Sequence, residues 1–199
     1  MPHEQSVSPD SPPRGSTQPR VQAFVEHLAN ICEDRGARAT LRRSAAFAPG
    51  EDVRAFPFVE PFLPDEAPAS ERRAFYLCAM LYAMHGQHQQ GRSLAKAFGA
   101  LWRKKDQRPS LEKRFIALLE ADADGLSEHL RQIVMLLKEE AFDHAALLTD
   151  LRELMKPYTT ERQNRIRARW AKDFYRSETR ATDASTAADT SEPAATPLP

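Results

Sequence analysis

The sequence contains few of the residues and motifs on which cofactor-binding folds depend. It has only 7 glycines in 199 residues, and it contains no glycine-rich phosphate loop, no GxSxG turn and no HExxH zinc motif. Each of these motifs holds backbone amides, a nucleophile or metal ligands at a set spacing that the chemistry requires. We therefore expect no cofactor, no bound metal and no catalytic residue, and we predict that the protein is not an enzyme.

Cysteines and long apolar runs are also scarce. The two cysteines, Cys32 and Cys78, form no CxxC pair, and both fall on predicted apolar helix faces. We interpret them as small core residues of a protein in a reducing compartment. No apolar stretch approaches 18 residues, and the N-terminus lacks the hydrophobic region of a signal peptide. The prediction is a cytoplasmic protein without a membrane partner.

Charge is balanced over the whole chain but not along it. The sequence holds 28 basic and 28 acidic residues, yet its two ends are poor in bulky apolar residues and rich in Pro, Ser, Thr and Ala. Such segments cannot bury enough apolar surface to offset the entropy of ordering, so 1–19 and 179–199 are predicted to be disordered tails. The remaining domain, 20–178, has a net charge of about +3. It is long enough to form a core without a metal or a disulfide.

Apolar residues recur at helical spacing through nearly the whole domain. The pattern predicts an all-α fold, a compact bundle of about eight or nine helices, without the fixed repeat of a solenoid. The central helix should span 70–85, because this stretch is apolar on nearly all sides after its first turn. Five prolines between 49 and 68 exclude a long helix there and predict an irregular segment packed on the bundle.

Capping residues and helix breakers predict the other helix boundaries. A first helix at 20–34 should stop at Gly36, and a short second helix should carry Arg38, Arg42 and Arg43. Three later helices should begin at the N-cap residues Ser93, Ser110 and Asp143. The further predicted breaks are Gly125 and Pro157, and the predicted buried face after Ser110 is Phe115, Ile116, Leu118 and Leu119.

The last predicted helix, 160–176, carries two separate stripes. Its basic residues recur at alternating steps of three and four, which keeps them within about 80° of arc, and its apolar residues point about 130° away. The basic stripe is Arg162, Arg165, Arg169, Lys172 and Arg176, and the apolar stripe is Ile166, Trp170 and Phe174. Because like charges repel, a stripe with almost no compensating acid favours an external polyanion. A solvated helix face would show the same pattern.

Basic clusters also recur elsewhere, and this recurrence favours a nucleic-acid track. They are Arg38 with Arg42 and Arg43, Arg103 with Lys104 and Lys105, Lys113 with Arg114, and Arg131 with Lys138. The aromatic residues Phe98, Trp102 and Trp170 have inward spacing, and we interpret them as core residues rather than stacking platforms for bases. Contact would then be mainly with phosphates and would depend weakly on nucleotide sequence.

Histidines and acidic clusters are the alternative candidates for chemistry. His85 and His88 have a spacing compatible with metal binding, but they lie in a polar turn without a nearby carboxylate or thiolate. His27, His129 and His144 are isolated on charged helices, where a hydrogen-bonded or exposed imidazole is commoner than a catalytic one. A metal-dependent hydrolase would need His85 and His88 to converge with acidic helix ends. Those ends carry Glu120, Asp122, Asp124, Glu139 and Glu140.

Six segments, spread over nearly the whole domain, carry a family resemblance. They are FVEHLANICEDRGARATLRRS at 24–44, SLAKAF at 93–98, KRFIALLEAD at 113–122, HLRQIVMLLK at 129–138, FDHAALLTDL at 142–151 and RWAKDFY at 169–175. In this order they resemble the CasB family, the small subunit of the type I-E CRISPR surveillance complex, Cascade. The resemblance spans about 20–178, and the two tails fall outside it.

The resemblance implies a small, all-helical, non-enzymatic protein that occurs as a pair beside the crRNA-bearing backbone of the complex. Its basic residues would help to hold target DNA, above all the displaced non-target single strand. The implied partners are the backbone and large subunits, crRNA, target DNA and a second copy of the chain. Lys96 stands where the family tends to have arginine, and a lysine lacks the bidentate phosphate geometry of arginine.

The candidate nucleic-acid residues combine the basic clusters with the positions that match the family. By position, the matches are Arg42, Arg43, Lys113, Arg114 and Arg131, and less closely Arg165 and Arg169. The full predicted set is Arg38, Arg42, Arg43, Lys96, Lys113, Arg114, Arg131, Arg162, Arg165 and Arg169. Such residues would stabilise the displaced strand and the R-loop in antiviral defence. The alternative is a helical adaptor or scaffold that uses the apolar residues of 49–68 and does not bind nucleic acid.

Overall fold

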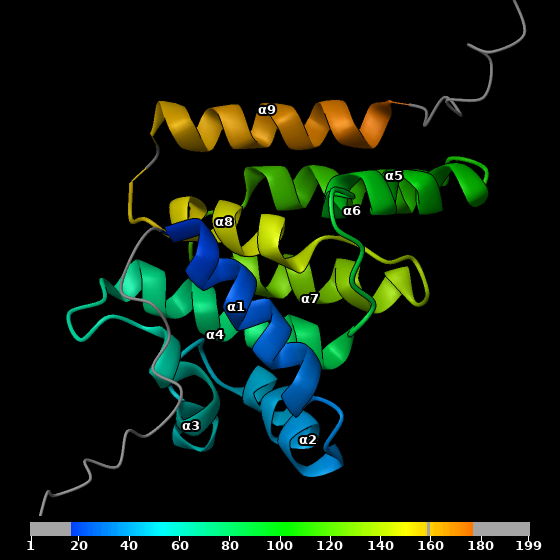
Figure 1. Ribbon diagram of the computed structural model, residues 1–199. Coiled ribbons are helices and arrows are strands. Elements are labelled where there is room, and N and C mark those ends of the chain that lie inside the picture. Colours follow the sequence, from blue (N-terminus) through cyan, green and yellow to red (C-terminus); the bar gives the residue numbers. More distant parts are fainter. Residues whose placement is uncertain (1–16, 159, 177–199) are drawn as a thin grey trace, which may run out of the picture.

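The computed structural model describes residues 17–158 and 160–176, which include the whole predicted domain except residues 159, 177 and 178. Within these ranges the chain forms nine α-helices and three short 3₁₀ helices, and no strand (Figure 1). The α-helices are α1 (Thr17–Ile31), α2 (Arg35–Arg43), α3 (Phe56–Val59), α4 (Ala69–Met84), α5 (Leu94–Lys104), α6 (Pro109–Glu120), α7 (Leu126–Leu137), α8 (His144–Leu154) and α9 (Glu161–Tyr175). The predicted all-α fold is confirmed. The predicted tails lie outside the described residues, apart from 17–19, which open α1.

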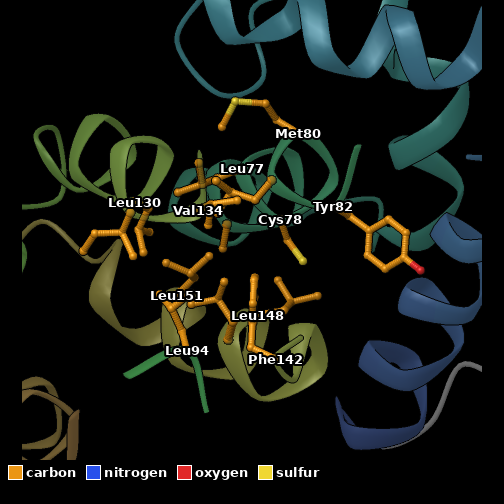
Figure 2. Packing of buried hydrophobic residues seen from close by; sticks show 14 of the residues in the cluster. Leu77, Cys78, Met80, Tyr82, Leu94, Leu130, Val134, Phe142, Leu148 and Leu151 are labelled. Carbon is orange, nitrogen blue, oxygen red and sulfur yellow. The ribbon is translucent and has the colours of Figure 1, made fainter. Parts of the chain in front are cut away.

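The core is built around α4, as its uniformly apolar sequence predicted. All ten residues from 74 to 83 are buried, and α4 packs against α1, α2, α7 and α8. Figure 2 shows Leu77 and Cys78 of α4 facing Leu148 and Leu151 of α8, with Val134 of α7 beside them. A helix that is apolar on all sides is stable only when neighbours cover every side. The position of α4 therefore determines where the other helices dock.

At one end of the molecule, α9 lies along α5 (Figure 1). The two helices approach closely at Gly99, where an added Cβ would lie 2.3 Å from the carbonyl oxygen of Phe174. The Phe174 ring stacks on Phe115 of α6 with ring centroids 4.0 Å apart. Ile166, Trp170 and Phe174 are all buried, so the predicted apolar stripe of the last helix is confirmed.

Two of the three predicted N-caps are confirmed. The Ser93 side chain accepts a hydrogen bond from the amide of Lys96, and Asp143 accepts from the amides of Ala145 and Ala146. The prediction for Ser110 is wrong, because α6 begins at Pro109 and Ser110 lies inside it. Proline is favoured in the first helical turn, where its missing N–H costs nothing. Gly125 precedes α7 as predicted, and Pro157 follows the end of α8.

Two further predictions are corrected by the packing. Gly36 does not stop the first helix; it lies in the first turn of α2, whose N-cap is Asp34. The Asp34 carboxylate accepts a 2.7 Å hydrogen bond from the amide of Ala37, so the chain turns before Arg35 rather than at the glycine. Ile116, predicted to be buried on α6, is 40% exposed, because the core covers only the Phe115 and Leu118 side of the helix.

The proline-rich segment and the cysteines follow the sequence predictions. Residues 49–68 contain only the four-residue helix α3 and the 3₁₀ helices Val53–Ala55 and Glu60–Phe62. Cys32 and Cys78 are free and buried. None of the helices in the described ranges is long and apolar enough to cross a membrane.

Candidate nucleic-acid interface

The most open basic surface lies on α2. We call it the α2 basic surface, and it consists of Arg35, Arg38, Arg42 and Arg43. All four side chains are exposed, and none of them has an ion-pair partner among the described residues. Ala37 and Leu41 are buried against α4, which turns the arginines outward. Four unpaired guanidinium groups on nine residues form a site that an external anion can occupy without displacing an internal partner.

Arg35 is a member of this surface that the sequence analysis missed. It lies three residues before Arg38, so the two side chains share one face of the helix. With Gly36 as the end of the first helix, Arg35 falls outside both predicted helices. Asp34 was the local signal for the correct boundary, because an aspartate N-cap there starts the second helix at Arg35.

The arginines of α9 are, in contrast, held by acids. Arg169 donates to Asp150 of α8, Arg162 lies 3.6 Å from Glu153 of α8, and Arg165 lies 2.9 Å from Glu161 of its own helix. Of the predicted stripe, only Lys172 and Arg176 lack an ion pair among the described residues. The expectation of a stripe almost without compensating acids is therefore wrong, because two of the acids come from another helix.

Asp150 joins α8 to α9 through two contacts. One carboxylate oxygen accepts from Arg169, and the other accepts a 2.7 Å hydrogen bond from the indole Nε1 of Trp170. Asp150 is buried, and Trp170 is only 2% exposed. Because a buried indole N–H needs an acceptor, Asp150 and Arg169 contribute to the attachment of α9.

The remaining candidates differ in availability. Lys113 is exposed without an ion pair in the described chain, while Arg114 donates a 2.9 Å hydrogen bond to the Gln132 side chain. Lys96 is half-buried on α5. Arg131 donates to the carbonyl of Ala45 and to Glu128, and so it ties α7 to the segment that follows α2.

The candidates do not form one continuous surface. Figure 1 shows α2 at one end of the molecule and α9, lying along α5, at the other. Lys113 and Arg114 lie on α6, which contacts α9 through a 2.9 Å hydrogen bond from the Tyr175 hydroxyl to Glu112. The structure thus brings the α5, α6 and α9 candidates to one end and leaves the α2 basic surface separate.

His144 differs from the prediction of a hydrogen-bonded or exposed imidazole. It is fully buried, neither ring nitrogen has a hydrogen-bond partner in the described structure, and its ring stacks on Phe142 with centroids 4.1 Å apart. Burial, together with the nearby His88 and His85, lowers the pKa of His144 to about 3, so it is neutral at pH 7. Burial also lowers the pKa of His85. No group of three or more His, Cys, Asp or Glu side chains in the described ranges could hold a metal ion.

The fold and its surfaces define a small all-helical protein with basic surfaces and a continuous apolar core. The family model described as CRISPR-associated protein Cse2 matches residues 37–175. A CRISPR-associated protein Cse2 from Thermus thermophilus is 48% identical over 141 residues, which cover 70% of this chain and 78% of the relative. The chain belongs to the Cse2 family, whose members are also called CasB.

Solved structures agree with this assignment. The crystal structure of M. ruber CasB is 33% identical with a TM-score of 0.67, and the match covers 78% of this chain and 92% of that one. A chain in a structure described as a CRISPR RNA-guided surveillance complex is 23% identical with a TM-score of 0.65, covering 79% of this chain and 92% of that one. The second likeness shows the shared fold alone.

Proposed function

We propose that this chain is the non-catalytic small subunit of a type I-E CRISPR surveillance complex, Cascade, and acts in the cytoplasm. Its membership of the Cse2 family supports this, as does the fold it shares with a chain of a CRISPR RNA-guided surveillance complex. Its partners are then the backbone and large subunits, crRNA, target DNA and a second copy of itself.

The observation that carries the nucleic-acid part of the proposal is the α2 basic surface. Its four exposed arginines have no ion pairs among the described residues, so phosphates can bind them without breaking internal contacts. Arginine suits this role because its planar group donates two parallel hydrogen bonds to a phosphate. Lys113, Lys172 and Arg176, at the opposite end of the molecule, are further cations without an ion pair among the residues that the structure describes.

The proposed action is electrostatic and needs no chemical step. When an RNA-guided complex opens a DNA duplex, the heteroduplex that forms is about as stable as the duplex that is lost. A protein that binds the displaced strand can therefore shift this balance toward the R-loop. In the assembled complex a second copy would strengthen the effect through avidity.

The test is the binding of the purified chain to labelled single-stranded DNA by fluorescence anisotropy between 50 and 200 mM salt. If four phosphates are neutralised, log affinity should fall with log salt at a slope of about −3. Arg42→Ala/Arg43→Ala should weaken binding at least about tenfold at low salt and reduce the slope by about 1.4.

Arg72→Ala/Arg73→Ala is the matched control, because it also removes two adjacent arginines. These arginines are paired with Glu60 and Asp124, so this variant should keep most of the affinity and most of the slope. Equal losses in the two double variants would show that net charge alone governs binding. No binding of the wild-type chain at 50 mM salt would contradict intrinsic binding of nucleic acid.

The packing of 49–68 weighs against the adaptor alternative. Val59 is fully buried, and Phe56, Phe58 and Phe62 pack against the core. Val53, at 67% exposure, is the main large apolar side chain that this segment presents to solvent. The segment thus serves the core of its own chain and offers little apolar surface to a partner.

A further inference from the structure

A groove runs beside the α2 basic surface, where the C-terminal ends of α1 and α4 meet α2. It has a volume of about 430 Å³, within the range of about 300 to 1,000 Å³ that is usual for small-ligand sites. Two arginines of the α2 basic surface, Arg38 and Arg42, form one wall. The rest of its lining is Ala29, Cys32, Glu33, Tyr82, Ala83, Met84 and Gly86.

The groove combines a neutral floor with a cationic rim. Ala29, Ala83 and Met84 are apolar, and burial raises the pKa of the Cys32 thiol, which keeps it protonated. Arg38 and Arg42 are one helical turn apart on the same face and have no ion-pair partner among the described residues. Glu33 is the one acidic side chain of the lining. The whole arrangement suits a ligand with a flat uncharged part and a flanking negative charge.

The helix ends disfavour an anion on the floor itself. The groove lies at the C-terminal ends of α1 and α4, where the helix dipoles are negative. The carbonyls of Ala83 and Met84, in the last turn of α4, accept no hydrogen bond from the residues that the structure describes. Free carbonyl groups of this kind accept hydrogen bonds from N–H donors. A nucleobase carries such donors, whereas a phosphate does not.

We propose that this groove binds one unstacked nucleobase of a single strand, while Arg38 and Arg42 hold the phosphates on either side of it. This inference rests on the proposed function and deepens it, because it makes the surface selective for single strands over duplex. A base in a duplex is stacked and paired and cannot enter the groove. Tyr82 is only 5% exposed and offers little surface to a base, so in this proposal the Met84 thioether and the helix carbonyls make the main contacts.

The experiment compares single-stranded DNA with an abasic strand of equal length, which keeps every phosphate and loses the bases. The full chain should bind the normal strand about fivefold more tightly, the low end of the contribution of one base contact. Ala29→Phe fills the groove from an exposed helical position and should abolish that preference. Its affinity for the abasic strand and its salt slope should stay unchanged. Ala146→Phe, at an exposed position of α8, is the matched control and should behave as wild type.

Cys32 provides a second readout that does not depend on affinity. The chain has two cysteines, and Cys78 is fully buried whereas Cys32 lines the groove. The Cys32 thiol is buried and protonated, so it reacts slowly, and its alkylation by iodoacetamide is followed at alkaline pH, where more of it is thiolate. Saturating normal DNA should slow this reaction about threefold or more, measured by peptide mass spectrometry. The abasic strand at saturation should slow it less.

The outcomes separate the two proposals. Salt-dependent binding of the normal and abasic strands with equal affinity, and equal protection of Cys32, would overturn the groove and leave the phosphate-binding function intact. Protection of Cys32 by an acidic peptide as strong as that by DNA would identify the groove as a peptide site and overturn the proposal. Absence of any DNA binding at 50 mM salt would overturn both.

Discussion

The two most basic helices of the protein, α2 and α9, differ in what their arginines contact. The four arginines of α2 point outward without internal ion pairs among the described residues, whereas Arg162, Arg165 and Arg169 of α9 are each matched by a carboxylate. From the charge pattern alone, α9 is the stronger candidate for binding nucleic acid, because it has more cations on one stripe. The ion pairs make α2 the stronger candidate instead.

For the binding of phosphates, we expect the availability of a cation to matter more than the number of cations. An arginine already paired with a buried acid must lose that partner before it binds a phosphate, so its net gain is small. An unpaired exposed arginine exchanges only water and counterions. On this basis we expect α2 to contribute mainly to the proposed binding, and the paired arginines of α9 mainly to holding the helix in place.

The largest expected effect tests the structural role of α9. Asp150→Ala should lower the free energy of unfolding by about 2–3 kcal/mol, because it leaves the buried Trp170 N–H and the Arg169 guanidinium without their acceptor. Asp150→Asn keeps an acceptor and should cost less. Urea denaturation followed by circular dichroism measures both values.

The same measurement on α2 completes the contrast. Arg42→Ala/Arg43→Ala should change the free energy of unfolding by less than about 0.5 kcal/mol, since both side chains are exposed and unpaired in the described structure. If this variant were as unstable as Asp150→Ala, the division between a binding helix and a structural helix would be wrong.

A change of pH should alter the free energy of unfolding by less than Asp150→Ala does, through a histidine in the region that supports α9. His144 opens α8, which supports α9, and its pKa is lowered to about 3 from an ordinary value of 6.5. Between these values the unfolded chain binds a proton that the folded chain does not, so stability falls as pH falls below about 6.5. From pH 7 to 5.5 the expected loss is about 1 kcal/mol from this group.

The His144→Phe variant gives the control for this prediction. Neither imidazole nitrogen of His144 has a hydrogen-bond partner in the described structure, so a phenyl ring loses no polar contact. The variant should show a weaker dependence of stability on pH, with a remainder from His85, whose pKa burial also lowers. DNA binding through α2 should barely change over this range, because arginine does not titrate. A pH dependence of stability that is identical in wild type and variant would contradict the assignment.

Local signals in the sequence predicted most of the helices. Ser93 and Asp143 each precede an apolar periodic run and cap it, and the prolines of 49–68 prevent a long helix. These effects act within four residues of the chain, so they are readable without the fold. The prediction that Gly36 ends the first helix was wrong, because a glycine also fits the first turn of a helix when an aspartate ahead of it supplies the cap.

The candidate site was less predictable because its decisive contacts are not local. Asp150 lies 19 residues before Arg169, and only the packing of α8 on α9 brings their side chains together. His144 looks like an isolated polar residue in sequence, yet Phe142 and Tyr82 cover its ring. Pairing and burial of this kind depend on tertiary structure, so charge patterning identified the basic residues but not which of them are free.

The smallest expected effect tests whether the acids of α8 restrain α9. Glu153 is buried and pairs with Lys156 at 2.7 Å and with Arg162 at 3.6 Å. Glu153→Gln removes this negative charge and keeps an acceptor, so it should raise the affinity for single-stranded DNA at 50 mM salt about twofold. Glu66→Gln, an exposed residue without an ion pair in the described chain, removes the same charge and should raise it less. Equal affinities in the two variants would mean that α9 contributes nothing to binding beyond its net charge, and the α2 basic surface would then account for the whole contact.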